Sequence, residues 1–246
     1  MKTKLLTLAT ISSLALSIGT QTFASPLLNK MPRAYQNLIN KEIKPIVLRG
    51  LNNKYKYLYD QTYLQRFRTT EPKDLYFSLK DLDNNGVDEL IIGEKDGWIY
   101  ELYTIDKKGK LKQIEDIKTV TGIGYHEWSG LINDNTIYHG TSGSTGGDTS
   151  INQVSGDKLI VKHYCFFGEY HKKTGKSILE LWGESENRDK FHTVYFYNKT
   201  GEYEEKTSRR TSDPDNKKSL CHFASYSEIE RRLQKLEHPL LPEIKR

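Results

Sequence analysis

The sequence Asp81-Leu82-Asp83-Asn84-Asn85-Gly86-Val87-Asp88-Glu89-Leu90-Ile91-Ile92 decides the fold. Oxygen-bearing side chains occupy the first, third and fifth positions, a glycine follows at the sixth, and an acid stands at the ninth. This spacing lets one short turn surround a hard cation such as Ca²⁺ with oxygen ligands. The stretch therefore predicts a structural calcium site in an EF-hand-like loop.

Five positions of this loop are predicted metal ligands. Four would contribute side-chain oxygens and one its backbone carbonyl, with the last acid binding directly or through water: Asp81, Asp83, Asn85, Val87 (carbonyl) and Glu89. Gly86 supplies the tight bend, because glycine adopts positive φ without steric cost. The alternative is a plain hairpin turn at Asn84-Asn85-Gly86, with the acids at the surface.

The flanks of the loop predict strands and not the helices of an EF-hand. Ile92 stands at the twelfth position, where an EF-hand has a bidentate glutamate. The segments 75–79 and 89–92 are short and rich in β-branched, aromatic and leucine residues, which favours strands. We therefore expect a strand–loop–strand arrangement.

Short apolar segments with polar separators continue from about residue 75 to 203. Their hairpin-length spacing favours an antiparallel meander over βαβ units. The predicted class is α+β, a mainly antiparallel sheet over residues 73–223 with helices at the N-terminal lead and the C-terminal end. Further predicted strands are Trp98–Ile105, Thr136–His139, Ile151–Val154, Lys158–Phe167, Ser177–Trp182 and His192–Tyr197.

Residues 25–72 are predicted to form a helical lead. Pro32 can open a first helix, with apolar residues at helical spacing up to Pro45. A second helix is expected over Tyr55–Phe67, whose aromatic residues fall on one side.

Residues 224–246 are predicted to form a C-terminal helix and tail, within one globular unit over 25–246. Ser225 as N-cap and Glu228 three residues later form a capping-box pattern. One apolar side follows before His238-Pro239 ends the helix: Ile229, Leu233 and Leu236.

Residues 1–24 have the pattern of a cleaved signal peptide. Lys2 and Lys4 precede an apolar run from Leu5 to about Ile18, and the segment ends on the small residue Ala24. No cysteine stands directly after the cleavage region, which argues against a lipid anchor, and no later hydrophobic stretch is long enough for a membrane span. We expect an exported protein, periplasmic or secreted.

The charge balance argues against a nucleic-acid partner. Removing Lys2 and Lys4 with the leader lowers the formal net charge from +5 to +3. So small a value, on a chain with 28% charged residues, indicates ordinary solubility and not a basic binding surface.

Cys165 and Cys221 are the two cysteines of the chain. In an exported protein such a pair is usually a disulfide, which here would tie a central strand to the approach of the last helix. Two buried thiols are the alternative.

No catalytic set is predicted. The Gly/Ser-rich stretch 140–148 lacks the Gly-x-Ser-x-Gly of a hydrolase elbow and the lysine of a P-loop, so we interpret it as a connector between strands. The seven histidines show no zinc spacing. His126 and Glu127 would suit an acid/base pair, and Glu180, Glu184 and Glu186 paired carboxylates, but both patterns are more typical of surface groups.

The layout resembles exported bacterial proteins and lipoproteins of unknown function that carry a single FG-GAP-like or VCBS-like calcium loop. The motif that carries the resemblance covers Asp81 to Gly93. It implies a metal loop and an exported location, and it implies no reaction. One good copy of the loop argues against a full β-propeller.

The sequence thus predicts an exported, non-enzymatic, calcium-stabilised domain that binds an unidentified protein or glycan. Two alternatives stay open. One is a secreted hydrolase or carbohydrate-acting enzyme using groups such as His126, Glu127 and Asp148. The other is an inhibitor or immunity-type protein.

Overall fold

The structure is a computed structural model, and it describes residues 30–45, 75–114, 120–122, 125–143, 145–181 and 188–241. The side chains of residues 120–126 are outside this description. The predicted signal peptide over 1–24 and the predicted helix over Tyr55–Phe67 also lie outside the described residues.

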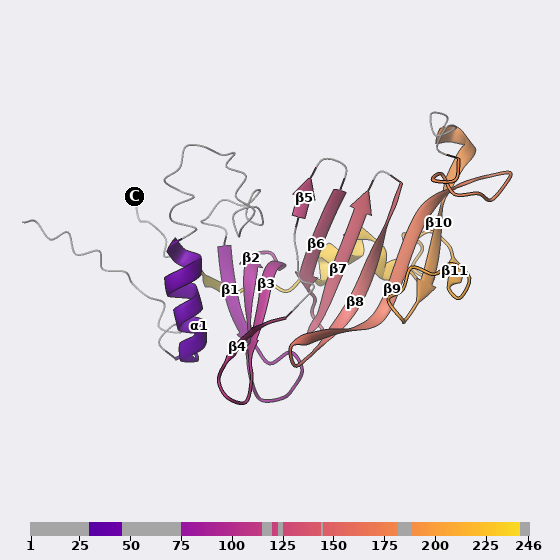
Figure 1. Cartoon of the computed structure of the whole chain (residues 1–246). Helices are drawn as coiled ribbons and strands as arrows, with labels where there is room; N and C mark the ends of the chain where they lie inside the picture. Colours follow the sequence, from indigo (N-terminus) through magenta and orange to yellow (C-terminus); the bar gives the residue numbers. More distant parts are fainter. Residues whose placement is uncertain are drawn as a thin grey trace, which may run out of the picture.

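Twelve strands of the described chain form one sheet, and all of their pairings are antiparallel (Figure 1). The prediction of a mainly antiparallel sheet is therefore confirmed. The strands are β1 (Leu75–Lys80), β2 (Glu89–Glu94), β3 (Trp98–Ile105), β4 (Leu111–Gln113), β5 (Val120–Gly122), β6 (Tyr125–Leu131), β7 (Thr136–Gly143), β8 (Gly146–Ser155), β9 (Lys158–His171), β10 (Phe191–Asn198), β11 (Arg209–Thr211) and β12 (His238–Pro239).

Most neighbours in the sheet are also neighbours in sequence. The order is β11-β10-β9-β8-β7-β6-β3-β2-β1-β12, with β4 paired to β3 and β5 to β6. The departures from a meander are the β3–β6 pairing and the return of β12 to β1. Short hairpins thus build most of the sheet, and the end of the chain closes one edge.

Few helices accompany the sheet. In the part of the chain that the structure describes, they are α1 (Arg33–Asn37), the π-helix η1 (Leu38–Ile43), the 3₁₀-helices η5 (Arg188–Lys190) and η6 (His222–Ala224), and α3 (Tyr226–Arg232).

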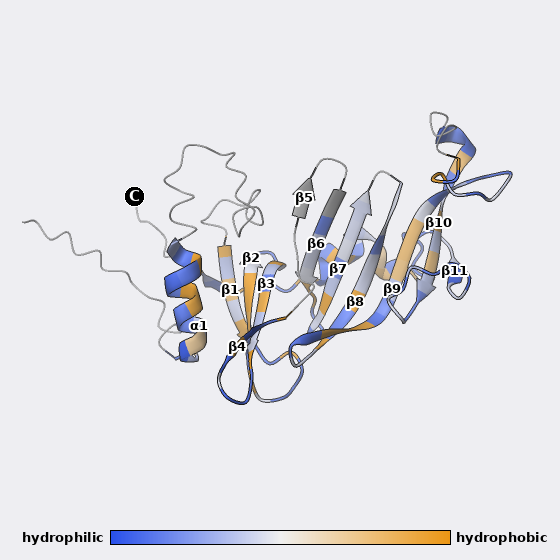
Figure 2. Cartoon of the chain, in the orientation of Figure 1, coloured by the Kyte–Doolittle hydropathy of each residue, from blue (hydrophilic) through white to orange (hydrophobic). Residues whose placement is uncertain are grey.

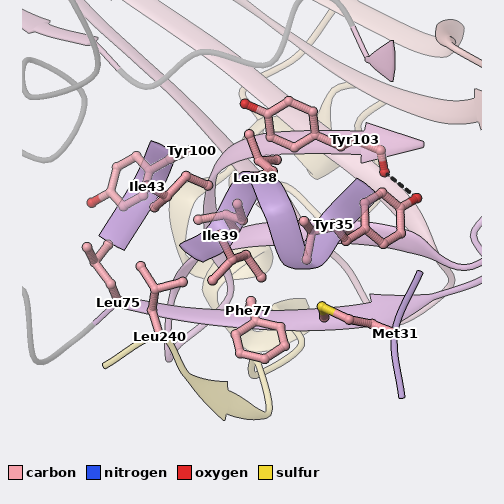
Figure 3. Packing of buried hydrophobic residues seen from close by; sticks show 12 residues of the cluster. Met31, Tyr35, Leu38, Ile39, Ile43, Leu75, Phe77, Tyr100, Tyr103 and Leu240 are labelled. Atoms are coloured by element: carbon pink, nitrogen blue, oxygen red, sulfur yellow. Dashed lines mark hydrogen bonds between the residues drawn. The ribbon is translucent and has the colours of Figure 1, made fainter. Parts of the chain in front are cut away.

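The predicted N-terminal helix is present as α1 and η1. It begins after Pro32, which holds the N-cap position. Its fully buried side chains Tyr35, Ile39 and Ile43 recur every four residues and pack on β1 to β3. Figure 3 shows these side chains against Leu75 and Phe77.

Hydrophobic residues are concentrated on one side of α1 and along β2 and β3, as Figure 2 shows. In β2, Leu90 and Ile92 face the α1 cluster, whereas Ile91 between them belongs to a second buried cluster with Ile99 and Leu102. β2 is thus buried on both faces, which explains its continuous apolar sequence.

The predicted C-terminal helix is present but ends early. α3 stops at Arg232, and Leu233 adopts an extended backbone that bridges to Ile132. The adjacent amide of Gln234 donates to the Leu131 carbonyl at 2.8 Å. These hydrogen bonds to the end of β6 replace the next helical turn. Leu236 is buried from an extended segment and not from the helix.

The predicted capping box does not form. Ser225 holds the N-cap position of α3, but its hydroxyl donates to Asp215 at 3.1 Å. The first-turn amide of Glu228 donates to the Ser225 backbone carbonyl. The prediction of Ser225 as the N-cap residue is therefore confirmed, whereas the predicted hydrogen bonds of the capping box are wrong.

Two further segments differ from the sequence prediction. Ser177–Trp182 was predicted as a strand, but Ser177 makes an isolated bridge to Tyr170 and residues 178–181 form a turn. His238-Pro239 was predicted to end a helix, but it forms β12 opposite Phe77 and Tyr76. Both differences come from pairing between distant segments, which local sequence does not encode.

Cys165 and Cys221 form a disulfide with their Cα atoms 5.8 Å apart. Both residues are fully buried. The bond joins the middle of β9 to the segment immediately before η6, where the sequence analysis placed it.

Candidate metal centre

The loop between β1 and β2 brings three carboxylates together. Oxygens of Asp81, Asp83 and Glu89 all lie within 4.8 Å of one another. Asn84 (φ 59°) and Gly86 (φ 83°) are left-handed and curl the loop on itself. A Cβ added at Gly86 would meet no atom within 4 Å, so the backbone conformation, and not crowding, favours glycine there.

Backbone amides of the loop hold the carboxylates in place. Asp81 accepts hydrogen bonds from the amides of Asn85 (3.0 Å) and Gly86 (2.8 Å). Asp83 accepts from Asn85 at 3.3 Å, and the Asn85 side-chain oxygen accepts from Val87 at 2.7 Å. These bonds fix the carboxylate orientations before any ligand arrives.

Glu89 is the buried member of the group. It is fully inaccessible at the first position of β2, where it accepts from the Leu82 amide (2.8 Å) and the Thr104 hydroxyl (3.0 Å). Burial, and then the charges of Asp83 and Asp81, raise the pKa of Glu89 to about 7. A bound cation would offset both causes, because it favours the charged carboxylate.

The donor set suits a hard cation. Carboxylate and amide oxygens are ligands for Ca²⁺ or Mg²⁺, while softer transition metals prefer imidazole and thiolate. Asp81, Asp83 and Glu89 would hold the ion, with Asn85 and Val87 in the same turn. Ile92 is fully buried in β2, so the twelfth position is used for packing.

Two hydrogen bonds to the β1–β2 loop come from distant segments and could not be predicted from the sequence. The Gly156 amide, in the turn between β8 and β9, donates to Asp83 at 2.9 Å. The Tyr35 hydroxyl of α1 donates to the Asp88 carbonyl at 2.9 Å. Segments 73 and 53 residues away in sequence therefore support the loop.

The Gly/Ser-rich stretch 140–148 is mostly strand and not the predicted connector. Residues 140–143 end β7 and residues 146–148 begin β8. A Cβ at Gly140 would lie 2.8 Å from the Tyr138 hydroxyl, and one at Gly147 would lie 2.2 Å from the Thr141 carbonyl. The glycines therefore permit close packing within the sheet.

Of the three candidate acid/base groups, the structure describes the side chains of Glu127 and Asp148. Glu127 of β6, Thr141 of β7 and Asp148 of β8 lie directly opposite one another, so they share a face of the sheet. Glu127 and Asp148 are two strands apart, or roughly 10 Å between Cβ atoms. The side chain of His126 is outside the described residues.

Glu127 and Asp148 contact different neighbours: Glu127 lies near His139, and Asp148 is bonded to Tyr164 and Thr141. His139 Nε2 lies 3.5 Å from Glu127, and His139 Nδ1 lies 3.1 Å from the Ser129 hydroxyl. Ser129 is fully buried and therefore inaccessible as a nucleophile. Asp148 accepts from the Tyr164 hydroxyl at 2.7 Å and from Thr141.

Sequence reasoning missed Ser129 and His139, since residues ten apart in sequence meet only through strand register. Of the three glutamates considered as paired carboxylates, Glu180 accepts from the Ser177 amide in a surface turn. Glu184 and Glu186 lie outside the described residues.

Comparison with known proteins found no matching family model, no matching curated protein and no matching solved structure. The resemblance of residues 81–93 to single FG-GAP-like or VCBS-like loops stays a prediction. Among the helices that the structure describes, none has the length and apolar character needed to cross a membrane.

Proposed function

We propose that this protein is an exported binding domain stabilised by one Ca²⁺ ion in the β1–β2 loop. The observation that carries the proposal is the convergence of Asp81, Asp83 and Glu89, with their oxygens within 4.8 Å of one another. Three carboxylates at this separation repel one another, and a divalent cation removes that repulsion. The partner is a protein or glycan.

Three further observations support the proposal. The disulfide between Cys165 and Cys221 is compatible with an oxidising compartment. The leader-like segment 1–24 supports export. The burial of Ser129, which makes its hydroxyl inaccessible as a nucleophile, favours binding over the hydrolase alternative.

Thermal unfolding of the mature chain, from about Ser25, tests the metal site. For a dissociation constant on the order of 10⁻⁴ M, about 10 mM Ca²⁺ stabilises by about 2.7 kcal/mol. We expect the midpoint to rise by roughly 5 to 10 °C over the value in EDTA. The double variant Asp81→Ala/Asp83→Ala should lose this rise, and Mg²⁺ should produce a smaller one.

Asp106→Ala is the matched control. Asp106 also accepts two backbone amides in a hairpin turn, from Lys108 and Lys110, each at 2.9 Å. It is not part of the three-carboxylate group. Its variant should keep the full Ca²⁺ response. The proposal of a metal site would be refuted if the double variant and Asp106→Ala lost the Ca²⁺-dependent rise in midpoint equally. It would also be refuted if the wild type showed no rise.

The binding role has its own test. The mature protein, immobilised with Ca²⁺, is exposed to envelope extract and to glycan arrays. We expect one partner to bind the folded protein in a saturable manner, and we expect the urea-unfolded protein not to retain it. Repeated failure to enrich any partner would refute the binding role without affecting the metal site.

A further inference from the structure

An open groove of about 520 Å³ lies between the central sheet and the C-terminal segment. Ile151 of β8, His163 of β9 and Tyr197 of β10 line it from the sheet. Leu220, His222 and Phe223 line it from the segment around η6. Its volume is in the range of small-molecule sites.

The acids of this groove are already neutralised. Asp134 pairs with Arg232 at 3.0 Å, and Glu228 pairs with Arg231 and lies 3.4 Å from His222. Lys162, also in the lining, has no carboxylate partner among the described residues. Of the two acids and two bases in the lining, Lys162 is therefore the one group left to pair with an incoming anion.

The two lining histidines, His163 and His222, are held in place by hydrogen bonds. Burial, and then the charges of Lys199 and Arg232, lower the pKa of His163. His163 Nδ1 lies 2.9 Å from the Tyr197 hydroxyl, so the ring is held in place. His222 directs Nδ1 to the Pro214 carbonyl (2.9 Å) and Nε2 to Glu228, so neither of its nitrogens is available to a metal.

An apolar surface adjoins this charge. The ring of Phe223 lies 5.7 Å from that of His163, and Leu220 is 43% exposed although it is a leucine. Ile151 forms part of the lining on the sheet side. A ligand that fits both parts needs an apolar body and a negatively charged group.

We infer that this groove binds a small organic carboxylate with an apolar or aromatic body. Its carboxylate pairs with Lys162, and its body packs on Phe223, Leu220 and Ile151. The carboxylate supplies the partner that Lys162 lacks, and one ammonium group suits a monoanion. The inference does not depend on the proposed metal site, because Asp81, Asp83 and Glu89 are not among the lining residues of the groove.

The disulfide holds the two walls of the groove together. Cys165 follows the lining residue His163 by two positions on β9, so the two side chains share a face. Cys221 lies between the lining residues Leu220 and His222. Ligand affinity should therefore require the oxidised protein.

Binding of 4-phenylbutyrate tests the inference, followed by NMR of the backbone amides and histidine rings of the oxidised chain. The matched neutral probe is 4-phenylbutyramide, and phenylphosphonate is the dianionic probe. We expect saturable shifts at His163 and His222 with the carboxylate. Lys162→Gln should weaken its affinity roughly two- to fivefold, as for loss of one exposed ion pair.

Lys158→Gln is the matched control, because Lys158 is also an exposed lysine of β9 and lies outside the groove lining. It should leave the affinity unchanged. The absence of saturable shifts, equal affinity for the amide, tighter binding of the dianion, or equal weakening by both lysine variants would each overturn the inference. Unchanged amide dispersion in both variants shows that they are folded.

Discussion

The two ends of the sheet are stabilised by different means. At the β1–β3 end, α1 and η1 cover the strands with side chains that are fully buried, such as Tyr35, Ile39 and Phe77. At the β9–β10 end the buried cluster is mainly aromatic; Phe166 is fully buried, but Tyr164 and Phe196 are 7% and 8% exposed. A disulfide links β9 to the C-terminal segment there. The comparison teaches that a covalent bond reinforces the end whose apolar cover is less complete.

Of the changes considered, removal of the disulfide should lower the free energy of unfolding most, and it should do so mainly at the β9–β10 end. For Cys165→Ser/Cys221→Ser we expect a loss of about 4 kcal/mol in the free energy of unfolding, because the bond closes a loop with a sequence separation of 56 residues. Urea unfolding measures the loss. Hydrogen exchange should show greater loss of protection in β9 and β10 than in β1 and β2. Equal loss at both ends would refute the division into two differently stabilised regions.

A cavity under α1 should weaken the opposite end. Ile39→Ala removes a fully buried side chain, which should cost about 3 kcal/mol. Hydrogen exchange in β1 and β2 should then accelerate more than in β9. Ile160→Ala is the control: Ile160 is 50% exposed, and its truncation should change stability by less than about 0.5 kcal/mol.

The pH dependence of stability extends the comparison to the β1–β2 loop, which contains Glu89. In EDTA the pKa of Glu89 is about 7 in the folded protein, above the ordinary value of 4.5. A raised folded-state pKa gives stability that is fully present below about pH 4.5 and lost as the pH rises through about 7. We expect a loss of roughly 2 to 3 kcal/mol between these limits, measured by urea unfolding. Glu89→Gln should flatten this dependence, and Ca²⁺ should reduce it. An equal slope in the variant would show that another group is responsible.

The smallest loss in the free energy of unfolding is expected from substituting either of two matched glycines. Gly86 (φ 83°) and Gly109 (φ 74°) both have positive φ, with open space around the added Cβ. Each substitution by alanine should cost about 1 kcal/mol from backbone strain alone. Gly86→Ala should also weaken the Ca²⁺ response in thermal unfolding, whereas Gly109→Ala should leave it intact. A normal response in Gly86→Ala would place the ion elsewhere.

The sequence predicted features that depend on neighbouring residues. The apolar runs of β2, β3 and β9 identified strands, and the oxygen spacing from Asp81 to Glu89 identified a loop whose three acids lie together. Local patterns suffice here because the β1–β2 hairpin brings its own ends together. The N-terminal helix was predictable for the same reason.

Features that depend on distant segments were missed. α3 ends at Arg232 because Leu233 pairs with Ile132, about a hundred residues earlier in the chain. The supports of the metal loop from Gly156 and Thr104 likewise follow from strand register. The groove around Lys162 is assembled from four strands and the C-terminal segment, so no single stretch of sequence reveals it.

The return of the chain to β1 also limits growth of the sheet. β12 is a two-residue strand that ends in Pro239, which has no amide hydrogen to offer another strand. The opposite edge, β11, is three residues long and carries Arg209 and Arg210. A short proline-containing edge and a short positively charged edge both oppose strand addition by a second copy. These two edges are thereby protected against edge-to-edge polymerisation at high local concentration.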